Sequence, residues 1–568
     1  MINLQLRDII KLTFLRLAFF ITRVIFIQNR NIFMQKKIFE LICCLLLVFS
    51  VYSLFADEDM NQDDDSQKLS RPITIVMQRQ NFDLNPRTAT YSSEAQLLDG
   101  LYEGLFSYDP RTLDPLPAIA ESFKISRDKK RWTFTIREGA KLSDGTKITA
   151  QLVRTCWLEL LKTRGAPYAS LLDCIRGAND FRNGKAKESD VGLLARDEKT
   201  LVVNLVVPTA HFSRILCHHA FSVYTGKKNV FSGAFALKSM TEDKLVLEKN
   251  KNYWDAKHVY APSITIVCSN DLNENSWLYN SGEADWVSGL VDIASVFNKS
   301  SLHISAVFGT EYIFFNCKNK TWNNADFRNA LITAVPWEEL RASSRIPATT
   351  LVYPLSGYPT VDGFTDYSKE DALEMIQEAK KKAGLKSDEK LSLVFGVSAD
   401  NPRQKAQFET LKAAWEPLGV VLDMQTTSAD RYIDSIAGWN ADLFSYSWIG
   451  DFADPLAFLE LFREGSSLNQ TQWKCPAFTE LLNNAALTND TTEHYKLLAK
   501  AENLLLDEGV ILPISHSLSL HAIDQNAVGG WFVNALDIHP YKYLYVKQSA
   551  AMLLPNVVLS ETQERNTL

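Results

Sequence analysis

One stretch of the sequence places a tryptophan and an acid on a predicted turn that leads into an apolar helix. Residues 445–462 read Ser-Tyr-Ser-Trp-Ile-Gly-Asp-Phe-Ala-Asp-Pro-Leu-Ala-Phe-Leu-Glu-Leu-Phe. Asp454 can cap the helix that follows, and Pro455 suits its first turn, where no backbone N–H is needed. Asp451 is then free for another role. On these residues alone, Asp451 is either a ligand-binding carboxylate or one more solvated loop acid.

The apolar segment after Asp454 must position these side chains. It predicts a helix from Leu456 onward, packed on the core through Leu456, Leu459, Leu461 and Phe462. A helix fixed in this way holds the preceding loop, which we expect to carry Trp448 and Asp451, at a defined place.

Trp-Ile-Gly-Asp-Phe-Ala-Asp-Pro at 448–455 resembles the ligand-anchoring loop of periplasmic oligopeptide-binding proteins of ABC transporters, within the bacterial extracellular solute-binding proteins of family 5. The resemblance covers nearly all of the chain after residue 70. Further motifs recur in family order: Leu101-Tyr-Glu-Gly-Leu105, Ala120-Glu-Ser-Phe-Lys124, Trp132-Thr-Phe-Thr-Ile-Arg-Glu-Gly139, Ser143-Asp-Gly-Thr146, Pro167-Tyr-Ala-Ser170, Asn252-Tyr-Trp254, Ser281-Gly-Glu-Ala-Asp285 and Val528-Gly-Gly530. One such match is weak, but the collinear set is strong.

The resemblance implies roles for several residues. Asp451 would pair with the α-amino group of a bound peptide, since a cation removed from water needs an opposite charge within hydrogen-bonding reach. Trp448 would wall a side-chain pocket, and Tyr168 would contribute a hydroxyl from the smaller lobe. The alternative for Tyr168 is a packed loop aromatic. Further ligand contacts are implied at Ser445, Ser447 and Ile449.

The end of the site that would receive a ligand carboxylate departs from the family pattern. Where well-known peptide binders carry arginines, this sequence has Ser445 and Ile436. Arg403 and Arg431 are nearby, but no motif assigns either of them a role. The resemblance therefore leaves open a blocked, branched or cell-wall-derived peptide, or a non-peptide solute such as a metal chelate or haem.

Length and charge limit the possible architectures and partners. A chain of 568 residues exceeds what one hydrophobic core usually supports, so two or more lobes are expected. Before Ala56 there are seven basic and two acidic residues, and the remainder carries 53 basic and 65 acidic residues. This acidic balance disfavours nucleic acid as a partner.

The first 56 residues have the organisation of an export signal. From Met34, a short basic segment is followed by an apolar core over residues 41–52 and by Ala56, a small residue suited to cleavage. We expect translation to start at Met34 and the mature, periplasmic chain to begin near Asp57. A lipid anchor at Cys43 or Cys44 is the less favoured alternative, because only a short apolar run precedes them.

The cysteines and histidines show no metal-binding spacing. Six cysteines follow the export signal, and none has a ligand-like neighbour at Cys-x-x-Cys spacing. They are Cys156, Cys174, Cys217, Cys268, Cys317 and Cys475. The cluster of His211, Cys217, His218 and His219 matches no metal pattern either, and we expect these histidines on a helix surface. No cofactor or metal is predicted.

Alternating strands and helices predict an α/β fold. Residues 391–397, 402–415 and 420–424 read as strand, helix and strand, and such crossovers build parallel sheets. We expect two hinged lobes of the periplasmic-binding-protein type, similar to cluster C. The expected divisions are an export region at 1–56, lobe I at 57–102, 224–308 and 519–550, a small subdomain of lobe I at 103–223, lobe II at 309–518, and a C-terminal tail at 551–568.

The sequence contains no catalytic signature: Gly-x-Ser-x-Gly, His-Glu-x-x-His and the phosphate-binding glycine motifs are all absent. With the export signal and the family motifs, this favours a binding protein and not an enzyme. The expected protein is a monomer that captures short peptides between its lobes and delivers them to an ABC permease and its ATPase at the inner membrane. An exported hydrolase or peptide-handling chaperone on the same fold is the alternative from another class.

Overall fold

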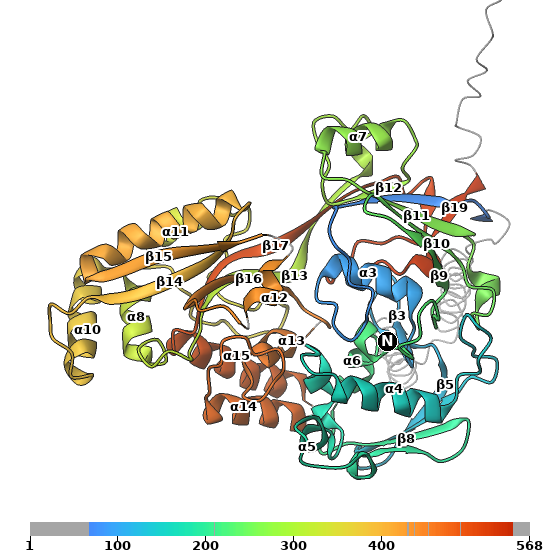
Figure 1. Ribbon diagram of the computed structural model, residues 1–568, viewed down its shortest axis with the longest axis horizontal. Coiled ribbons are helices and arrows are strands. Elements are labelled where there is room, and N and C mark those ends of the chain that lie inside the picture. The colour runs from blue at the N-terminus through green and yellow to red at the C-terminus, as the bar shows by residue number, and fades with distance from the viewer. Residues whose placement is uncertain are drawn as a thin grey trace, which may run out of the picture. The chain divides into compact units, whose positions relative to one another are not determined.

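A ten-stranded sheet runs through the part of the chain that the computed structural model describes, residues 68–209, 211–428, 431–436, 438–452, 454–488 and 490–548 (Figure 1). The predicted export signal and the predicted tail at 551–568 lie outside these residues. The strands follow one another across the sheet in the order β15 (Val420–Thr427), β14 (Leu391–Ser398), β16 (Leu443–Ile449), β13 (Leu302–Phe315), β17 (Ile511–Ile523), β12 (Trp286–Ser288), β2 (Ile73–Met77), β11 (Ser263–Cys268), β10 (Lys244–Lys249) and β9 (Phe235–Met240).

The strand–helix–strand unit predicted from the sequence forms one end of this sheet. α11 (Pro402–Trp415) connects β14 to β15, which pair in parallel. The side chain of Asn401 accepts hydrogen bonds from the first turn of α11, and Pro402 occupies its N-terminal position. Buried residues of both strands and of α11 share one core with α8 (Ala325–Thr333) and α10 (Lys369–Lys382).

The other end of the sheet is built from segments far apart in the sequence. β2 pairs in parallel with β11 and with β12, and β10 joins β11 and β9 through antiparallel pairing. α3 (Ser92–Leu101) buries Leu97, Leu98 and Leu101 in the core beside these strands. Buried residues of β2 and α3 therefore share one core at this end of the sheet.

Two long antiparallel strands, β13 and β17, connect the two ends of the sheet. Their pairing begins at Leu302 with Ala522, which lies beside β12, and ends at Phe314 with Ile511, where β16 lies on the other side of β13. The register shifts between Ala306 and Thr310, so the paired ribbon is irregular near its middle.

A separate four-stranded antiparallel sheet forms within residues 103–223. Its order is β5 (Ala120–Ile125), β6 (Arg131–Ile136), β8 (Thr200–Asn204) and β7 (Leu193–Ala195). Trp132, Phe134 and Ile136 alternate along β6 and are buried on one of its faces. α4 (Ala150–Lys162) is capped by Thr149, whose side chain accepts the Leu152 N–H.

The remaining described elements are short strands outside these two sheets and further helices. They are the strands β1 (Lys68–Leu69), β3 (Phe106–Tyr108), β4 (Pro115–Pro117), β18 (Val528–Gly529) and β19 (Tyr545–Lys547), and the helices α5 (Ala178–Arg182), α6 (Phe212–Ile215), α7 (Leu272–Asn280), α9 (Trp337–Leu340), α12 (Tyr432–Ile436), α13 (Leu456–Leu459), α14 (Pro476–Leu487) and α15 (Thr491–Asp507).

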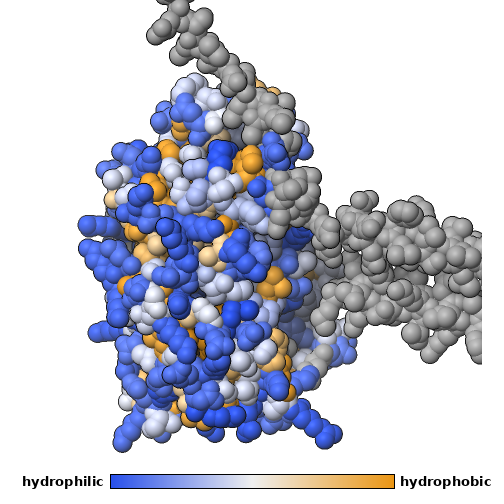
Figure 2. Space-filling view, turned by 90° about the vertical axis from the view of Figure 1, so that its right-hand side faces the viewer, coloured by the Kyte–Doolittle hydropathy of each residue, from blue (hydrophilic) through white to orange (hydrophobic). Residues whose placement is uncertain are grey.

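One face of the described chain is mostly polar. Figure 2 shows a face on which hydrophilic residues predominate and apolar residues are scattered between them. Within the residues searched, no helix has the length and apolar character needed to cross a membrane. All six cysteines after the predicted signal are free thiols, and Cys156 is buried in α4.

Candidate functional site

The segment around Trp448 is a strand that runs into a turn, and the prediction that Trp448 lies on a loop is wrong. β16 extends to Ile449, and Trp448 pairs with Thr310 of β13. The Trp448 side chain is buried, and its Nε1–H donates to the Ala457 carbonyl oxygen at 3.0 Å. This hydrogen bond ties the end of the strand to α13.

The helix that follows is shorter than its apolar sequence suggested. α13 covers only Leu456–Leu459 before a tighter turn at Glu460–Phe462, although the four predicted apolar residues are all buried. Pro455 occupies the N-cap position, one residue earlier in the helix than predicted, so Asp454 is not the N-cap residue itself. Asp454 nevertheless accepts the Leu456 N–H at 2.9 Å and so satisfies a free amide of the first turn.

Asp454 also forms an ion pair. His494 Nε2 lies 3.0 Å from Asp454 Oδ2, and His494 Nδ1 lies 2.8 Å from the Ala485 carbonyl oxygen. Because a carbonyl can only accept, Nδ1 carries a proton, and the carboxylate favours a second proton on Nε2. These contacts raise the pKa of His494 and lower the pKa of Asp454, although burial opposes both shifts. His494 is therefore the cation that compensates Asp454.

Asp451 lies in a different environment, although it is only three residues away. Its side chain is 9% exposed, and the Tyr108 hydroxyl donates to its backbone carbonyl at 3.2 Å. Among the described residues, the one ion-pair partner of its carboxylate is His218, whose Nε2 lies 3.4 Å from Oδ1. Burial raises the pKa of Asp451 to about 8. The carboxylate is thus destabilised unless a positive charge reaches it.

His218 does not supply that charge. The Ala220 N–H donates to His218 Nδ1 at 3.3 Å, so this nitrogen keeps its lone pair and the single ring proton lies on Nε2. Burial, with a smaller contribution from His219, holds the pKa of His218 well below its usual range. The close approach of His218 to Asp451 is therefore a contact between a neutral imidazole and a carboxyl group.

Asp451 faces a cavity of about 250 Å³ that is formed by several distant segments. It is lined by Thr90, Tyr91, Ser92, Ala95, Gln96, Tyr168, His218, Ile433, Tyr446, Ser447, Trp448, Ile449, Gly450, Asp451, Leu536, Asp537 and Ile538. Five of the six predicted site residues therefore line one cavity. Ser445 does not line it: this residue is buried in β16, and its backbone N–H donates to the Tyr432 hydroxyl.

Aromatic rings cover one wall of this cavity. The rings of Tyr168 and Trp448 have centroids 6.1 Å apart, and the Tyr168 ring lies 4.2 Å from the ring of His218. Tyr446 stacks on Trp448 at 6.4 Å. Tyr168 comes from the segment before the 3₁₀ turn Ala169–Cys174, so this wall joins residues 103–223 to β16.

No lysine or arginine is among the described residues that line the cavity. Arg403 forms an ion pair with Glu311 at 2.8 Å, Arg431 is exposed, and Ile436 is buried in the core. The cavity therefore presents two carboxylic acids, Asp451 and Asp537, and no fixed positive charge among its described lining residues.

The histidines near residue 218 are buried, and the expectation that they lie on a helix surface is wrong for two of them. His218 and His219 are 6% and 3% exposed and belong to a 3₁₀ turn at His219–Phe221 and its cap. The surrounding apolar residues Phe212, Ile215, Leu216 and Phe221 are a signal that could have predicted this burial. His211 is partly exposed and stacks on Phe452 at 5.3 Å.

A second histidine cluster was not predicted. His521, Asp537 and His539 bring their side-chain nitrogen and oxygen atoms within 4.8 Å of one another, as the ligands of a metal ion would be. His521 lies in β17, whereas the other two residues follow β18. Their separation along the chain left no spacing pattern to detect.

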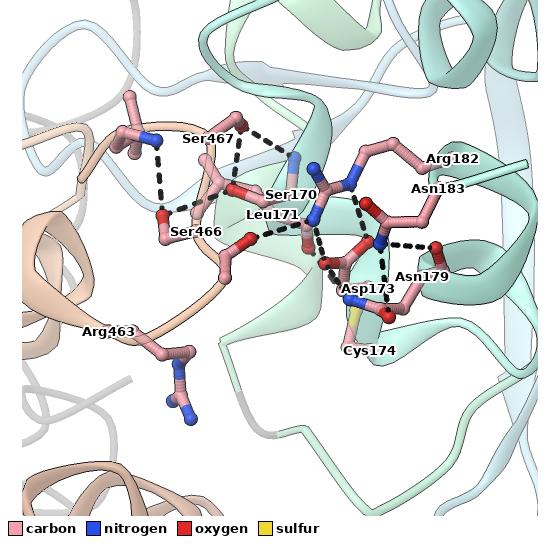
Figure 3. Close-up of polar contacts among 12 residues, drawn as sticks. Ser170, Leu171, Asp173, Cys174, Asn179, Arg182, Asn183, Arg463, Ser466 and Ser467 are labelled. Atoms are coloured by element: carbon pink, nitrogen blue, oxygen red, sulfur yellow. Dashed lines mark hydrogen bonds and ion pairs between the residues drawn. The ribbon is translucent and has the colours of Figure 1, made fainter. Parts of the chain in front are cut away.

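A larger cavity of about 380 Å³ lies between residues 170–215 and 452–487. The charged side chains of its lining have partners, because Asp173 pairs with Arg182 at 2.6 Å, Arg463 with Glu460 at 2.7 Å and Glu464 with Lys474 at 3.9 Å. Figure 3 shows the polar contacts that join the two segments, with Ser170 facing Ser466 and Ser467 and with Arg182 near Gly465. This region therefore joins two parts of the chain, and its charges are already compensated.

Comparisons with known proteins agree with the family resemblance. The sequence profile of the bacterial extracellular solute-binding proteins, family 5 Middle, matches residues 114–470. The chain is 27% identical to the oligopeptide-binding protein OppA of Bacillus subtilis, over 87% of this chain and 97% of the relative. It is 26% identical to the periplasmic murein peptide-binding protein MppA of Escherichia coli, over 84% and 94% of the two chains.

Solved structures have the same fold. The E. coli murein tripeptide-binding protein MppA aligns with a TM-score of 0.74 at 23% identity, over 85% of this chain and 99% of that chain. Haemophilus influenzae OppA in complex with the peptide RPPGFSPFR aligns with a TM-score of 0.74 at 22% identity, over 84% and 99%. The unliganded open form of MppA aligns with a TM-score of 0.58 at 24% identity, over 85% and 99%.

Proposed function

Because the chain belongs to the bacterial extracellular solute-binding proteins of family 5, we propose that it captures short peptides between two lobes and delivers them to an ABC permease. The observation that carries the proposal is the state of Asp451, a buried acid on a cavity wall with no cationic partner among the described residues. A peptide ammonium group would supply the missing charge.

Other residues of the same cavity would hold the rest of the ligand. Tyr168 and Trp448 would enclose a side chain of the peptide, because their rings form one wall. Ser447 and Ile449 would contact the extended peptide backbone along the edge of β16. The relatives named as oligopeptide-binding or murein peptide-binding proteins support a peptide ligand.

We assign residues 57–102, 224–308 and 519–550 to lobe I, 103–223 to its small subdomain and 309–518 to lobe II. β13 and β17 would then form the hinge, because they are the long strands that connect both ends of the sheet. The contacts between residues 167–182 and 463–467 in Figure 3 would break when the lobes open. The open form reported for MppA supports such a motion.

We also propose that the protein is exported, that it acts with a membrane complex and that it is not an enzyme. The mature protein would be a periplasmic monomer that contacts the permease and its ATPase complex at the membrane. It would release peptides unchanged and would need no cofactor, as expected of a family of solute-binding proteins.

The test is to purify the protein without added ligand and to analyse it by native mass spectrometry, followed by calorimetric titration with short peptides. We expect co-purified peptides, saturable binding, and recovery of each peptide intact after incubation. Small-angle scattering should show compaction on binding. Peptide cleavage would favour the hydrolase alternative, and a co-purified chelate or haem with no peptide binding would contradict the proposal.

A further inference from the structure

Asp537 is the second acid on the wall of the cavity that holds Asp451. Its side chain is 25% exposed, whereas that of Asp451 is 9% exposed. Its backbone φ of +56° is a conformation that aspartate and asparagine adopt more readily than most residues. The Asn534 side chain fixes the surrounding loop by accepting the N–H groups of Leu536 and Ile538.

Two histidines hold the carboxylate of Asp537 as an anion. His521 Nε2 lies 2.8 Å and His539 Nε2 lies 3.3 Å from the same oxygen, Oδ1. These contacts lower the pKa of Asp537 despite its burial. No described residue donates a hydrogen bond to Oδ2, so this oxygen is the one that remains available to a ligand.

The protonation of His521 argues against a metal ion at this cluster. Trp286 Nε1–H can only donate, and it lies 3.1 Å from His521 Nδ1. Nδ1 must therefore accept, and the ring proton must lie on Nε2, which points at Asp537. A histidine that binds a metal through Nε2 carries its proton on Nδ1 and donates it to an acceptor, which is the opposite arrangement.

We propose that Asp537 is a specificity residue that selects peptides with a cationic side chain. This inference rests on the proposed function, in which Asp451 receives the α-ammonium group. The cavity then contains a second anion, held by two imidazole donors: His521 is neutral because its Nδ1 accepts from Trp286, and burial lowers the pKa of His539. No basic residue is among the described residues that line the cavity, so none neutralises this anion. A lysine or arginine side chain placed at Asp537 Oδ2 would form a charge-assisted hydrogen bond in a partly desolvated place.

The test uses alanine tripeptides in which one position at a time is lysine or norleucine, an uncharged side chain of similar shape. Calorimetry on the intact protein should find one position at which lysine binds about tenfold tighter than norleucine. In Asp537→Asn this ratio should fall below about threefold, since asparagine suits the backbone conformation but carries no charge. The affinity for the norleucine peptide should be nearly unchanged, which would show that the variant is folded.

Asp423→Asn is the matched control, because Asp423 is an exposed acid on β15 outside the cavity. This variant should keep the full lysine preference. Equal binding of lysine and norleucine peptides by the parent at every position would overturn the inference, as would an unchanged ratio in Asp537→Asn. In both cases peptide binding itself, and with it the proposed function, would stand. Binding of no peptide at all would contradict the proposed function first.

A zinc titration tests the alternative that His521, Asp537 and His539 bind a metal ion. We expect the parent protein and Asp537→Asn to bind the same amount of Zn²⁺. One equivalent bound by the parent and lost in Asp537→Asn would show that the three side chains are metal ligands, and the specificity role would be wrong.

Discussion

Two aspartates three residues apart, Asp451 and Asp454, each contact a histidine, and the two pairs have opposite electrostatics. At Asp454, the partner His494 directs one nitrogen to a carbonyl and the other to the carboxylate, so it is a cation. At Asp451, the partner His218 accepts a backbone N–H on one nitrogen, so it is neutral. The first pair is complete, whereas the second has an acid without a counter-charge.

The difference lies in what faces the second nitrogen of each histidine. A carbonyl requires a proton on that nitrogen, and an amide N–H excludes one. The pair at Asp454 therefore stabilises the turn that presents the site. At Asp451, the neutral histidine leaves the carboxyl group without a counter-charge among the described residues, so a cation of the ligand can pair with it. One loop thus combines a structural acid with a proposed binding acid.

The largest expected effect concerns the binding acid. Asp451→Asn keeps the shape of the side chain but removes the charge that would meet the peptide ammonium group. Loss of one member of such a pair typically costs about 2 to 5 kcal/mol, which is roughly a 30-fold to several-thousand-fold loss of affinity. Calorimetry with a free-amine peptide measures this loss, and Asp423→Asn, away from the cavity, should bind like the parent.

The next effect concerns pH. The pKa of Asp451 is raised to about 8 in the ligand-free protein, and a bound ammonium group should lower it. Binding is therefore coupled to loss of a proton from Asp451, and affinity should fall about tenfold per pH unit below pH 8. Above pH 8 the peptide amino group, with an ordinary pKa of about 7.7 to 8.0, loses its own charge. A flat profile from pH 6 to 8 would contradict a protonated Asp451.

The two acids should also differ in their effects on the stability of the ligand-free protein. Asp454→Asn should lower the free energy of unfolding by about 1 to 3 kcal/mol near pH 6, since it weakens a turn contact and a charged pair. Asp451→Asn should instead raise the free energy of unfolding near pH 6. The folded pKa of Asp451 is raised from 3.8, so its ionisation destabilises the folded state as pH rises toward 8. Asparagine removes this penalty, and its advantage should disappear near pH 4. Chemical denaturation of both variants measures the contrast.

The smallest expected effect concerns the ligand carboxylate. No lysine or arginine lines the cavity among the described residues, so amidation of a bound peptide should change its affinity by less than about tenfold. A larger loss in calorimetry would show that a basic residue outside this lining receives the carboxylate.

Local patterns predicted most of the elements that frame the site. The βαβ unit predicted at 391–424 follows from the pattern of neighbouring residues, and the structure has β14, α11 and β15 there. Trp448 was misplaced on a loop because Trp-Ile-Gly-Asp was interpreted as a turn. The alternation of Ser445, Tyr446, Ser447 and Trp448 was the better signal, since β16 continues to Ile449.

Sequence reasoning could not predict what surrounds the two acids of the cavity. The neutral state of His218 depends on one backbone N–H in a 3₁₀ turn more than 230 residues before Asp451. Asp537 meets His521 only because β17 returns beside β12, where Trp286 fixes the proton of His521. Contacts of this kind arise from long-range packing, which has no period in the sequence.

The most direct test of the central claim combines Asp451→Asn with N-acetylation of the same peptide. Acetylation removes the ammonium group, so it should weaken binding to the parent strongly, by about 30-fold or more, and binding to the Asn variant by less than about threefold. This coupling would show that Asp451 and the ligand amino group interact. Equal losses in both proteins would show that Asp451 does not contact the amino group, and the account of Asp451 as the binding acid would be wrong.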